Sequence, residues 1–286
     1  MTEPISIGVI GGSGLYAMPE LTHVTQHTML TPFGKPSADV VIGTLGGKRV
    51  AFIPRHGIGH VFTPTTVPYR ANICALKMLG VRLIVAVNAC GSLREDYAPG
   101  HIVIPDQLVD YTKADRGRTF FETGLVAHVS VADPFSPELG SIAAQAVREI
   151  GGTVHWGGMY VTIEGPRFST RGESQIFRQL GGSIIGMTTC PEAFLAREAE
   201  IAYTSMSHIT DYDVWHDEPV STEMVIQTFH SNLRTAQQAL ARAVELIDVE
   251  ADYPCHHALD GAIMTDRSAI QINRLRPIVS RVFPDL

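Results

Sequence analysis

Short apolar runs that end in glycine-rich or polar loops recur along the 286-residue chain and alternate with helical patterns. Residues 5–10, 83–87 and 201–209 are rich in β-branched and other apolar side chains, which is typical of buried strands. Residues 68–79 and 137–150 instead repeat apolar side chains at helical spacing. Strands and helices in alternation predict a single α/β domain in which helices flank a central mixed β-sheet.

The remaining segments extend this pattern without a break in composition. Further strands are expected at residues 40–45, 49–53, 102–104 and 153–163, and further helices at residues 171–180 and 191–200. A long amphipathic helix is expected after Ser221, with an apolar stripe formed by Phe229, Leu233, Ala236, Leu240, Val244 and Ile247. We therefore expect one domain over residues 1–248 and an appendage of uncertain structure over residues 249–286.

Composition excludes several classes of protein. Apolar residues make up 45% of the chain and charged residues 18%, which excludes intrinsic disorder. The net charge is −7 and no basic run occurs, so we expect neither a nucleic-acid partner nor a membrane partner. No export signal or membrane-spanning run is found, and four cysteines lie far apart without zinc-ligand spacing. We expect a cytoplasmic protein with reduced thiols and no metal.

The first expected strand runs into the loop Gly11-Gly12-Ser13-Gly14. Backbone N–H groups and the Ser13 hydroxyl of such a loop can close around a phosphate. The same residues also fit a plain tight turn. A loose dinucleotide fingerprint fits less well, because Met18-Pro19 interrupts the helix that should follow it.

Two more polar loops follow expected strands, at the sheet edge where α/β proteins bind ligands. Arg55 and His56 could supply a planar fork and a further donor to a phosphate, although a surface arginine that caps a loop fits equally well. His60, in the same turn, could simply be solvated. Residues 88–93 could present backbone amides, such as that of Ala89, to a ligand, or could form a glycine-stabilised turn.

Three later loops also follow expected strands, at residues 164–168, 187–189 and 210–213. Polar and aromatic groups at three strand ends predict a pocket more strongly than any one loop does. Taken singly, Phe168 and Met187 would be assigned to core packing. Asp211 and Asp213 could merely cap turns.

Taken together and in order, these loops resemble the motifs of one family, the trimeric purine nucleoside phosphorylases and methylthioadenosine phosphorylases. The similar motifs are G-G-S-G (11–14), T-P-F-G-K-P-S (31–37), R-H-G (55–57), N-A-C-G-S-L-R-E (88–95), A-D-P-F (132–135), T-I-E-G-P-R-F-S-T-R-x-E-S (162–174), G-M-T-T-x-P-E (186–192) and T-D-Y-D (210–213). The resemblance covers most of the chain and implies a nucleoside phosphorylase-like fold. The tail after Asp248 has no match.

The resemblance implies reversible phosphorolysis of methylthioadenosine to adenine and methylthioribose 1-phosphate. Phosphate, a co-substrate, would be held by Ser13, Arg55, His56, the Ala89 amide and Thr188. The nucleoside would contact Phe168, Ser169, Met187, His60, His128, Thr222 and Val225, with His128 reaching in from a neighbouring subunit of a homotrimer, or of a hexamer built from two trimers. Asp211 and Asp213 would be the catalytic residues that address the base, and neither a metal nor another cofactor would be needed.

Three positions depart from the animal-type pattern of this family: Ser13 and Asn88 replace threonines, and Thr222 replaces a valine that faces the methylthio group. The Thr222 hydroxyl puts strict selectivity for methylthioadenosine over adenosine in doubt. A phosphorylase of 6-oxopurine nucleosides or methylthioinosine is the nearest alternative, but a 6-oxo group calls for a donor where Asp211 stands. A nucleotide-binding module without catalysis and an NAD-dependent oxidoreductase are alternatives from other classes.

Overall fold

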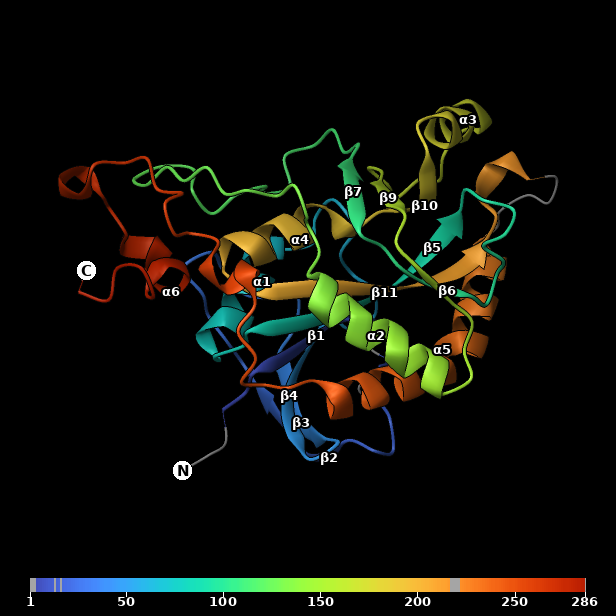
Figure 1. Ribbon diagram of the computed structural model, residues 1–286, viewed down its shortest axis with the longest axis horizontal. Coiled ribbons are helices and arrows are strands. Elements are labelled where there is room, and N and C mark those ends of the chain that lie inside the picture. The colour runs from blue at the N-terminus through green and yellow to red at the C-terminus, as the bar shows by residue number, and fades with distance from the viewer. Residues whose placement is uncertain (1–3, 13, 16, 217–221, 286) are drawn as a thin grey trace.

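The computed structural model describes residues 4–12, 14–15, 17–216 and 222–285, with only the backbone for residues 222–227, 229–232 and 273 (Figure 1). An 11-stranded mixed sheet forms its centre, as predicted. Along its main path the strands follow the order β2-β3-β4-β1-β5-β10-β9-β7, and β11, β6 and β8 continue from β5 as a branch. The strands are β1 (Ile7–Gly11), β2 (Thr22–His27), β3 (Val40–Leu45), β4 (Lys48–Pro54), β5 (Leu83–Ser92), β6 (Ile102–Ile104), β7 (Gln107–Asp110), β8 (Val154–Trp156), β9 (Met159–Thr162), β10 (Gly182–Gly186) and β11 (Ala202–Asp211).

Strand β5 is the branch point of the sheet. It pairs in parallel with β1 on one side and with β11 along most of its length on the other. At Gly91 and Ser92 it also pairs antiparallel with β10. Residues 88–92 were predicted as a loop, and that prediction is wrong: they continue the strand because β11 supplies backbone partners as far as Gly91.

Helices cover both faces of the sheet, and alternating strand side chains meet them. The helices are α1 (Tyr69–Met78), α2 (Pro137–Glu149), α3 (Arg171–Gln179), α4 (Thr189–Glu198), α5 (Thr222–Leu246) and α6 (Arg276–Val279). One core packs Leu83 and Val85 of β5 with α2 and α5, and a second core packs Ile84 and Ala86 with α1 and α4. This alternation of side chains on a strand buried on both faces fixes the register of the central strands.

Two other predictions about the strands need correction. Residues 153–163 were expected to form one strand but form two, because Gly157 and Gly158 adopt positive φ angles of 82° and 109° between β8 and β9. Strands β2 and β7 were not predicted at all, since β2 has one apolar side chain among six exposed residues and β7 has four residues. Over the residues that the structure describes, no helix is both long and apolar enough to cross a membrane.

The tail packs against the body and against a loop that is far away in the sequence. Its Leu275, Ile278 and Val279 are buried in the core beside α1 and α4. Residues 119–131 and 254–283 lie side by side at the left of Figure 1, and a β-bridge joins Ala127 to Ile263. We call these two segments the lobe. A domain boundary at residue 248 stays a prediction.

Candidate active site

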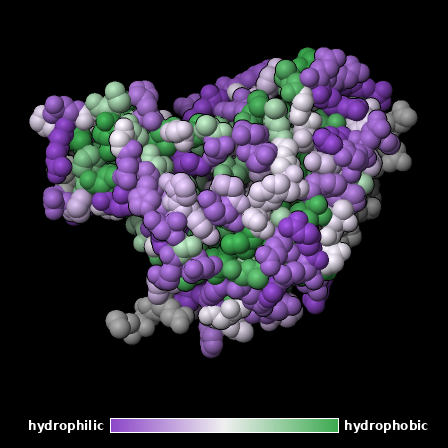
Figure 2. Space-filling view, in the orientation of Figure 1, coloured by the Kyte–Doolittle hydropathy of each residue, from purple (hydrophilic) through white to green (hydrophobic). Residues whose placement is uncertain are grey.

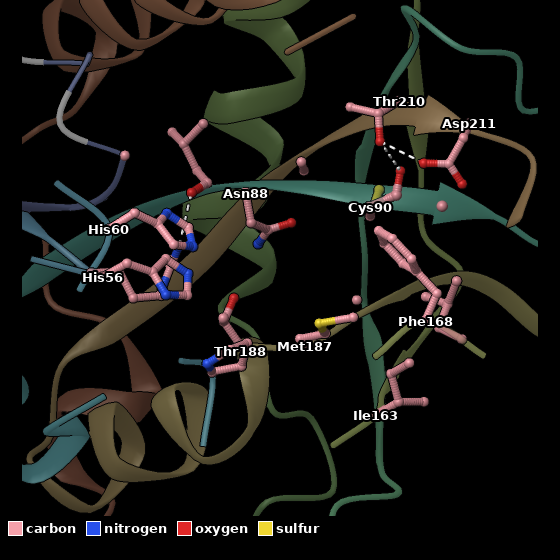
Figure 3. Close-up of a pocket in the computed structure, with 18 of the residues that line it drawn as sticks. His56, His60, Asn88, Cys90, Ile163, Phe168, Met187, Thr188, Thr210 and Asp211 are labelled. Carbon is pink, nitrogen blue, oxygen red and sulfur yellow. Dashed lines mark hydrogen bonds between the residues drawn. The ribbon is translucent and has the colours of Figure 1, made fainter. Parts of the chain in front are cut away.

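A cavity of about 460 Å³ lies at the carboxyl ends of the central strands. Residues from the ends of β4, β5, β10 and β11 line it, together with the loop after β9 and one side chain of α5, Leu233. The cavity has two ends, as Figure 3 shows. His56 and Thr188 lie toward one end, Phe168 and Asp211 lie at the other, and Asn88 and Met187 lie between them. This sheet edge is the one at which open α/β sheets bind their ligands.

The sheet brings most of the predicted site residues together. Those that line the cavity are Arg55, His56, His60, Ala89, Phe168, Ser169, Met187, Thr188, Asp211 and Asp213. His128 is not among the lining residues of this chain; it lies in the lobe, where its amide donates to the Ala262 carbonyl over 2.8 Å. Ser13 lies outside the described residues, and the side chains of Thr222 and Val225 are not described.

At the first end of the cavity, His56 has a fixed tautomer. Its Nδ1 lies 2.9 Å from the Phe62 carbonyl oxygen, and because a carbonyl can only accept, Nδ1 carries the proton and donates. Its ring stacks on that of His60 with centroids 4.2 Å apart. Burial, and then the adjacent charge of Arg55, lower the pKa of His56 to about 4, so the ring is neutral at pH 7. Its Nε2 then carries no proton, so it can accept from a protonated phosphate oxygen but cannot be the further donor that the sequence predicted.

Arg55 is held by a residue that the sequence did not single out. Its Nε and Nη2 each donate to a carboxylate oxygen of Glu192 over 2.7 Å, and its Nη1 donates to the Val87 carbonyl over 3.1 Å. Tyr203 donates to the same carboxylate. Burial disfavours both charges, but Glu192 raises the pKa of Arg55 above its usual value. The guanidinium is thus a fixed, buried positive charge beside the cavity, with one Nη1 proton still free of these bonds.

No physical argument from the sequence selects Glu192, because its burial appears only in the structure. It is 1% exposed, and a buried carboxylate needs a cationic partner. Its position in the G-M-T-T-x-P-E motif, which also contains the predicted pocket residues Met187 and Thr188, was the available signal.

At the other end, the two aspartates differ in what they already bind. One oxygen of Asp211 accepts from the Thr210 hydroxyl over 2.7 Å, and the other accepts from the Asp213 amide over 2.8 Å. Among the described residues, Oδ2 of Asp213 and the hydroxyl of Ser169 are buried without a partner. Both groups line the cavity, and buried polar atoms without partners are rare in proteins. This end is therefore suited to a ligand with a polar edge.

Burial also tunes the protonation of these acids. It raises the pKa of Asp211, against the opposing hydrogen bonds from Thr210 and Asp213. It raises the pKa of Asp213 as well. Phe168 beside them is 38% exposed, so its ring presents apolar surface to the cavity rather than packing in the core. An acid of raised pKa beside an aromatic face suits proton transfer to a flat heterocycle.

Residues 6–245 match the model of the phosphorylase superfamily, and the chain belongs to that superfamily. The S-methyl-5′-thioadenosine phosphorylase of Chloroflexus aurantiacus is 53% identical over 281 residues, which cover 96% of this chain and 98% of the relative. A crystal structure of methylthioadenosine phosphorylase from an Antarctic soil metagenomic library has a TM-score of 0.91 at 48% identity, covering 97% of this chain and 98% of the other.

A second solved structure is of a variant of the adenosine/methylthioadenosine phosphorylase of Schistosoma mansoni in complex with adenine. Its TM-score is 0.81 at 38% identity, and the match covers 86% of this chain and 93% of the other. These similarities confirm the predicted family and the nucleoside phosphorylase-like α/β fold.

Proposed function

We propose that this enzyme cleaves 5′-methylthioadenosine with phosphate, giving adenine and 5-methylthioribose 1-phosphate. The observation that carries the proposal is the two-ended cavity: a buried cation with hydroxyl and imidazole groups at one end, and unpaired acceptors beside an exposed aromatic ring at the other. The identity of 53% to a methylthioadenosine phosphorylase over nearly the whole chain supports this substrate.

The reaction needs the phosphate and the base to lie on opposite sides of the sugar. A phosphate oxygen forms the new bond to C1′ while the bond from C1′ to N9 of the purine breaks, and the purine gains a proton at N7. Arg55, His56, Thr188, the Ala89 amide and Ser13 would orient the phosphate as nucleophile. No covalent intermediate with the protein is required, and phosphate is the only co-substrate.

The base is read by the aspartates. With a raised pKa, Asp211 can hold the proton that passes to N7, since burial favours its neutral form. When Asp213 is ionised, its Oδ2 is an acceptor for a 6-amino group, which donates. A 6-oxo group would face that acceptor without a hydrogen bond, so adenine is favoured over hypoxanthine. Phe168 would stack on the purine face, with Ser169 at its edge and Met187 along the ribose.

Adenosine is proposed as a second substrate. The Schistosoma mansoni relative is named for both adenosine and methylthioadenosine. Thr222 would place a hydroxyl near the 5′ group, beside Val225. Thr222→Val removes that hydroxyl at similar volume, so the ratio of kcat/KM for methylthioadenosine over adenosine should rise, by about tenfold to a hundredfold. An unchanged ratio would show that Thr222 does not face the substrate.

We also propose a cytoplasmic homotrimer. In it, His128 of each chain would reach into the pocket of a neighbouring chain and lie there near that chain's own His60. On the face drawn in Figure 2, apolar side chains gather on the lobe at the left, and its large exposed apolar side chains are Val126, Val131 and Met264. An apolar surface of this kind suits a partner subunit. Light scattering that gave a fully active monomer would refute the trimer, whereas a hexamer would keep its trimeric interface.

The function is tested by following release of the free base, adenine from methylthioadenosine and adenosine and hypoxanthine from inosine, each with and without phosphate. We expect release from the first two only when phosphate is present, and much slower cleavage of inosine. Release without phosphate would indicate a hydrolase. Faster cleavage of inosine would favour the 6-oxopurine alternative.

A further inference from the structure

Arg116 is a buried arginine that does not line the cavity but binds two segments that do. Its side chain is 0% exposed. Its Nη1 donates to the carbonyl oxygens of Met187 and Cys190 over 2.7 and 3.3 Å. Its Nη2 donates to the backbone and side-chain oxygens of Glu164. The planar guanidinium thus joins the loop after β9 to the loop after β10, as only a multi-donor fork can.

Glu164, its partner, is held from several sides. One carboxylate oxygen accepts from the Thr65 hydroxyl over 2.7 Å, and the other accepts from the amides of Lys113 and Ala114 over 2.5 and 2.7 Å. Partial burial alone would raise the pKa of this carboxyl, but the hydrogen bonds, beginning with that of Thr65, lower it to about 2. The group is therefore an anion at every pH at which the protein would be assayed.

The two loops that Arg116 joins also touch each other at the nucleoside half of the cavity. Gly165, directly after Glu164, has a positive φ of 59°, and a Cβ built on it would lie 2.5 Å from the Met187 sulfur. Gly165 leads within three residues to Phe168, and both Phe168 and Met187 line the cavity. A shift of either loop would therefore change the gap between the aromatic ring and the Met187 side chain.

We propose that Arg116 is a positioning residue for the nucleoside: through the Glu164 side chain and the Met187 carbonyl it sets the separation of Phe168 and Met187. The proposal rests on the proposed function only in naming the ligand as a nucleoside. The phosphate end has its own support, since His56 is held by the Phe62 carbonyl and Arg55 by Glu192. Loss of Arg116 should act mainly on the nucleoside half; of the proposed phosphate ligands, Thr188 shares the loop after β10 that Arg116 binds.

The test compares Arg116→Lys with Arg118→Lys. Lysine keeps the charge of Arg116 but cannot span Glu164 and Met187 at once. Arg118 is the matched control, because it lies on the same segment and its side chain is 45% exposed. Among the described residues it donates to Thr112 and Ala114 and pairs with Asp110. For each variant we would measure the dissociation constant of adenine by calorimetry, KM for methylthioadenosine and for phosphate, and the melting temperature.

Arg116→Lys should raise the adenine dissociation constant and the methylthioadenosine KM about tenfold, which corresponds to about 1.4 kcal/mol. The phosphate KM should change by less than about twofold, and Arg118→Lys should change none of the three. If the Arg116 variants fail to fold, Glu164→Gln takes their place in the test. It keeps the shape of the partner side chain and should raise the same two constants.

Two results would overturn the proposal. A lower melting temperature with an unchanged adenine dissociation constant would make Arg116 a purely structural residue. A rise in the phosphate KM as large as that in the methylthioadenosine KM would show that Arg116 does not act selectively on the nucleoside half. Adenine binding requires no turnover. Its dissociation constant therefore tests the positioning role of Arg116 even if the wild-type protein does not cleave methylthioadenosine. In that case the proposed function fails separately.

Discussion

The pocket and the lobe are built in opposite ways. Pocket side chains such as Arg55 and Asp211 project from the ends of strands that are paired on both sides and buried on both faces, so the sheet itself sets their spacing. The lobe has one isolated β-bridge and short helical turns. Its two segments meet through backbone bonds, such as Met264 to Val126 and Gln271 to Gly124, and through apolar side chains that join the core beside α1 and α4. Paired strands position the chemistry, whereas the lobe is irregular and is tied to the body by packing and by a few polar anchors.

Those anchors are polar contacts to the ends of α4 and β11. Glu198 accepts from the Thr119 hydroxyl and the Phe120 amide, both over 2.7 Å. Glu200, which is 3% exposed, accepts from Arg281 and from the Leu259 amide. Changes in the sheet should therefore affect chemistry and overall stability, while changes at these anchors should affect the lobe first.

The largest effect is expected where the pocket depends on a buried ion pair. Arg55→Ala leaves Glu192 buried without its cation, which should lower the free energy of unfolding by about 3 to 5 kcal/mol. Chemical denaturation would measure this. Arg55→Ala combined with Glu192→Gln should recover a large part of the stability but not phosphate binding. If Arg55→Ala alone kept full stability, the pair would not support the sheet edge.

Asp211→Asn should reduce chemistry without a comparable loss of stability. Asparagine keeps an acceptor for Thr210 or the Asp213 amide but has no transferable proton, so kcat/KM for methylthioadenosine should fall by about 100-fold or more. Inosine-type substrates should lose much less, because the asparagine N–H can donate to a 6-oxo group and so offsets part of the loss. Steady-state kinetics on both substrate classes checks this, and equal losses in a folded variant would remove Asp211 from the role of base-reading acid.

Arg281→Ala should loosen the lobe and spare the pocket. Arg281 is 37% exposed while Glu200 is buried, so the loss of unfolding free energy should be about 2 kcal/mol, below that of a fully buried pair. Hydrogen exchange should rise over residues 254–283, with adenine affinity within about twofold of wild type. A loss of adenine affinity as large as that of stability would show that the pocket and the lobe are not independent.

The smallest effect concerns pH. Burial, against the bonds from Phe120 and Thr119, raises the pKa of Glu198 from 4.5 to about 7, so the folded state favours its protonated form. Its contribution to stability is complete below about pH 4.5, is lost as the pH rises to about 7, and is constant above that. Between pH 4.5 and 7, the free energy of unfolding should therefore fall by about 1 to 2 kcal/mol less in Glu198→Gln than in the wild type.

His208 provides the opposite pH trend within the sheet. It is fully buried on β11, and burial lowers its pKa to about 4, so its contribution favours folding above pH 6.5 and is lost as the pH falls toward 4. Melting temperatures of wild type and Glu198→Gln between pH 4.5 and 7 would separate the two groups. An unchanged slope in Glu198→Gln would mean that Glu198 is not the titrating anchor.

The contrast between the pocket and the lobe also explains what the sequence could predict. Strand ends can be recognised in the sequence as apolar runs that stop at polar residues, which predicted a pocket at the loops that contain Met187 and Asp211. The resemblance to the phosphorylase family then added Arg55 to the same pocket. The continuation of β5 through residues 88–92 could not be predicted, because it depends on the partner strand β11, whose paired residues lie 119 or 120 positions further along the chain, as in Asn88 with Ser207 and Gly91 with Asp211. Arg116 and Glu192 act through residues distant in sequence, so spacing carried no signal for them.

The lobe was hidden for a related reason. Ala127 and Ile263 pair across a long stretch of sequence, and neither lies in a run with strand or helix periodicity. The tail was therefore predicted only as an appendage, although Leu275 and Ile278 are completely or almost completely buried. Burial of isolated apolar residues in irregular segments has no periodic signature.

The central claim is that the two ends of one cavity bring phosphate and a purine nucleoside together for direct transfer. Phosphorus NMR of the wild-type protein with methylthioadenosine and inorganic phosphate tests it most directly, because it shows where the phosphate goes. We predict a new sugar 1-phosphate resonance that grows in step with free adenine, one for one. Adenine released while all phosphorus stays inorganic, or no adenine released at all, would contradict the account.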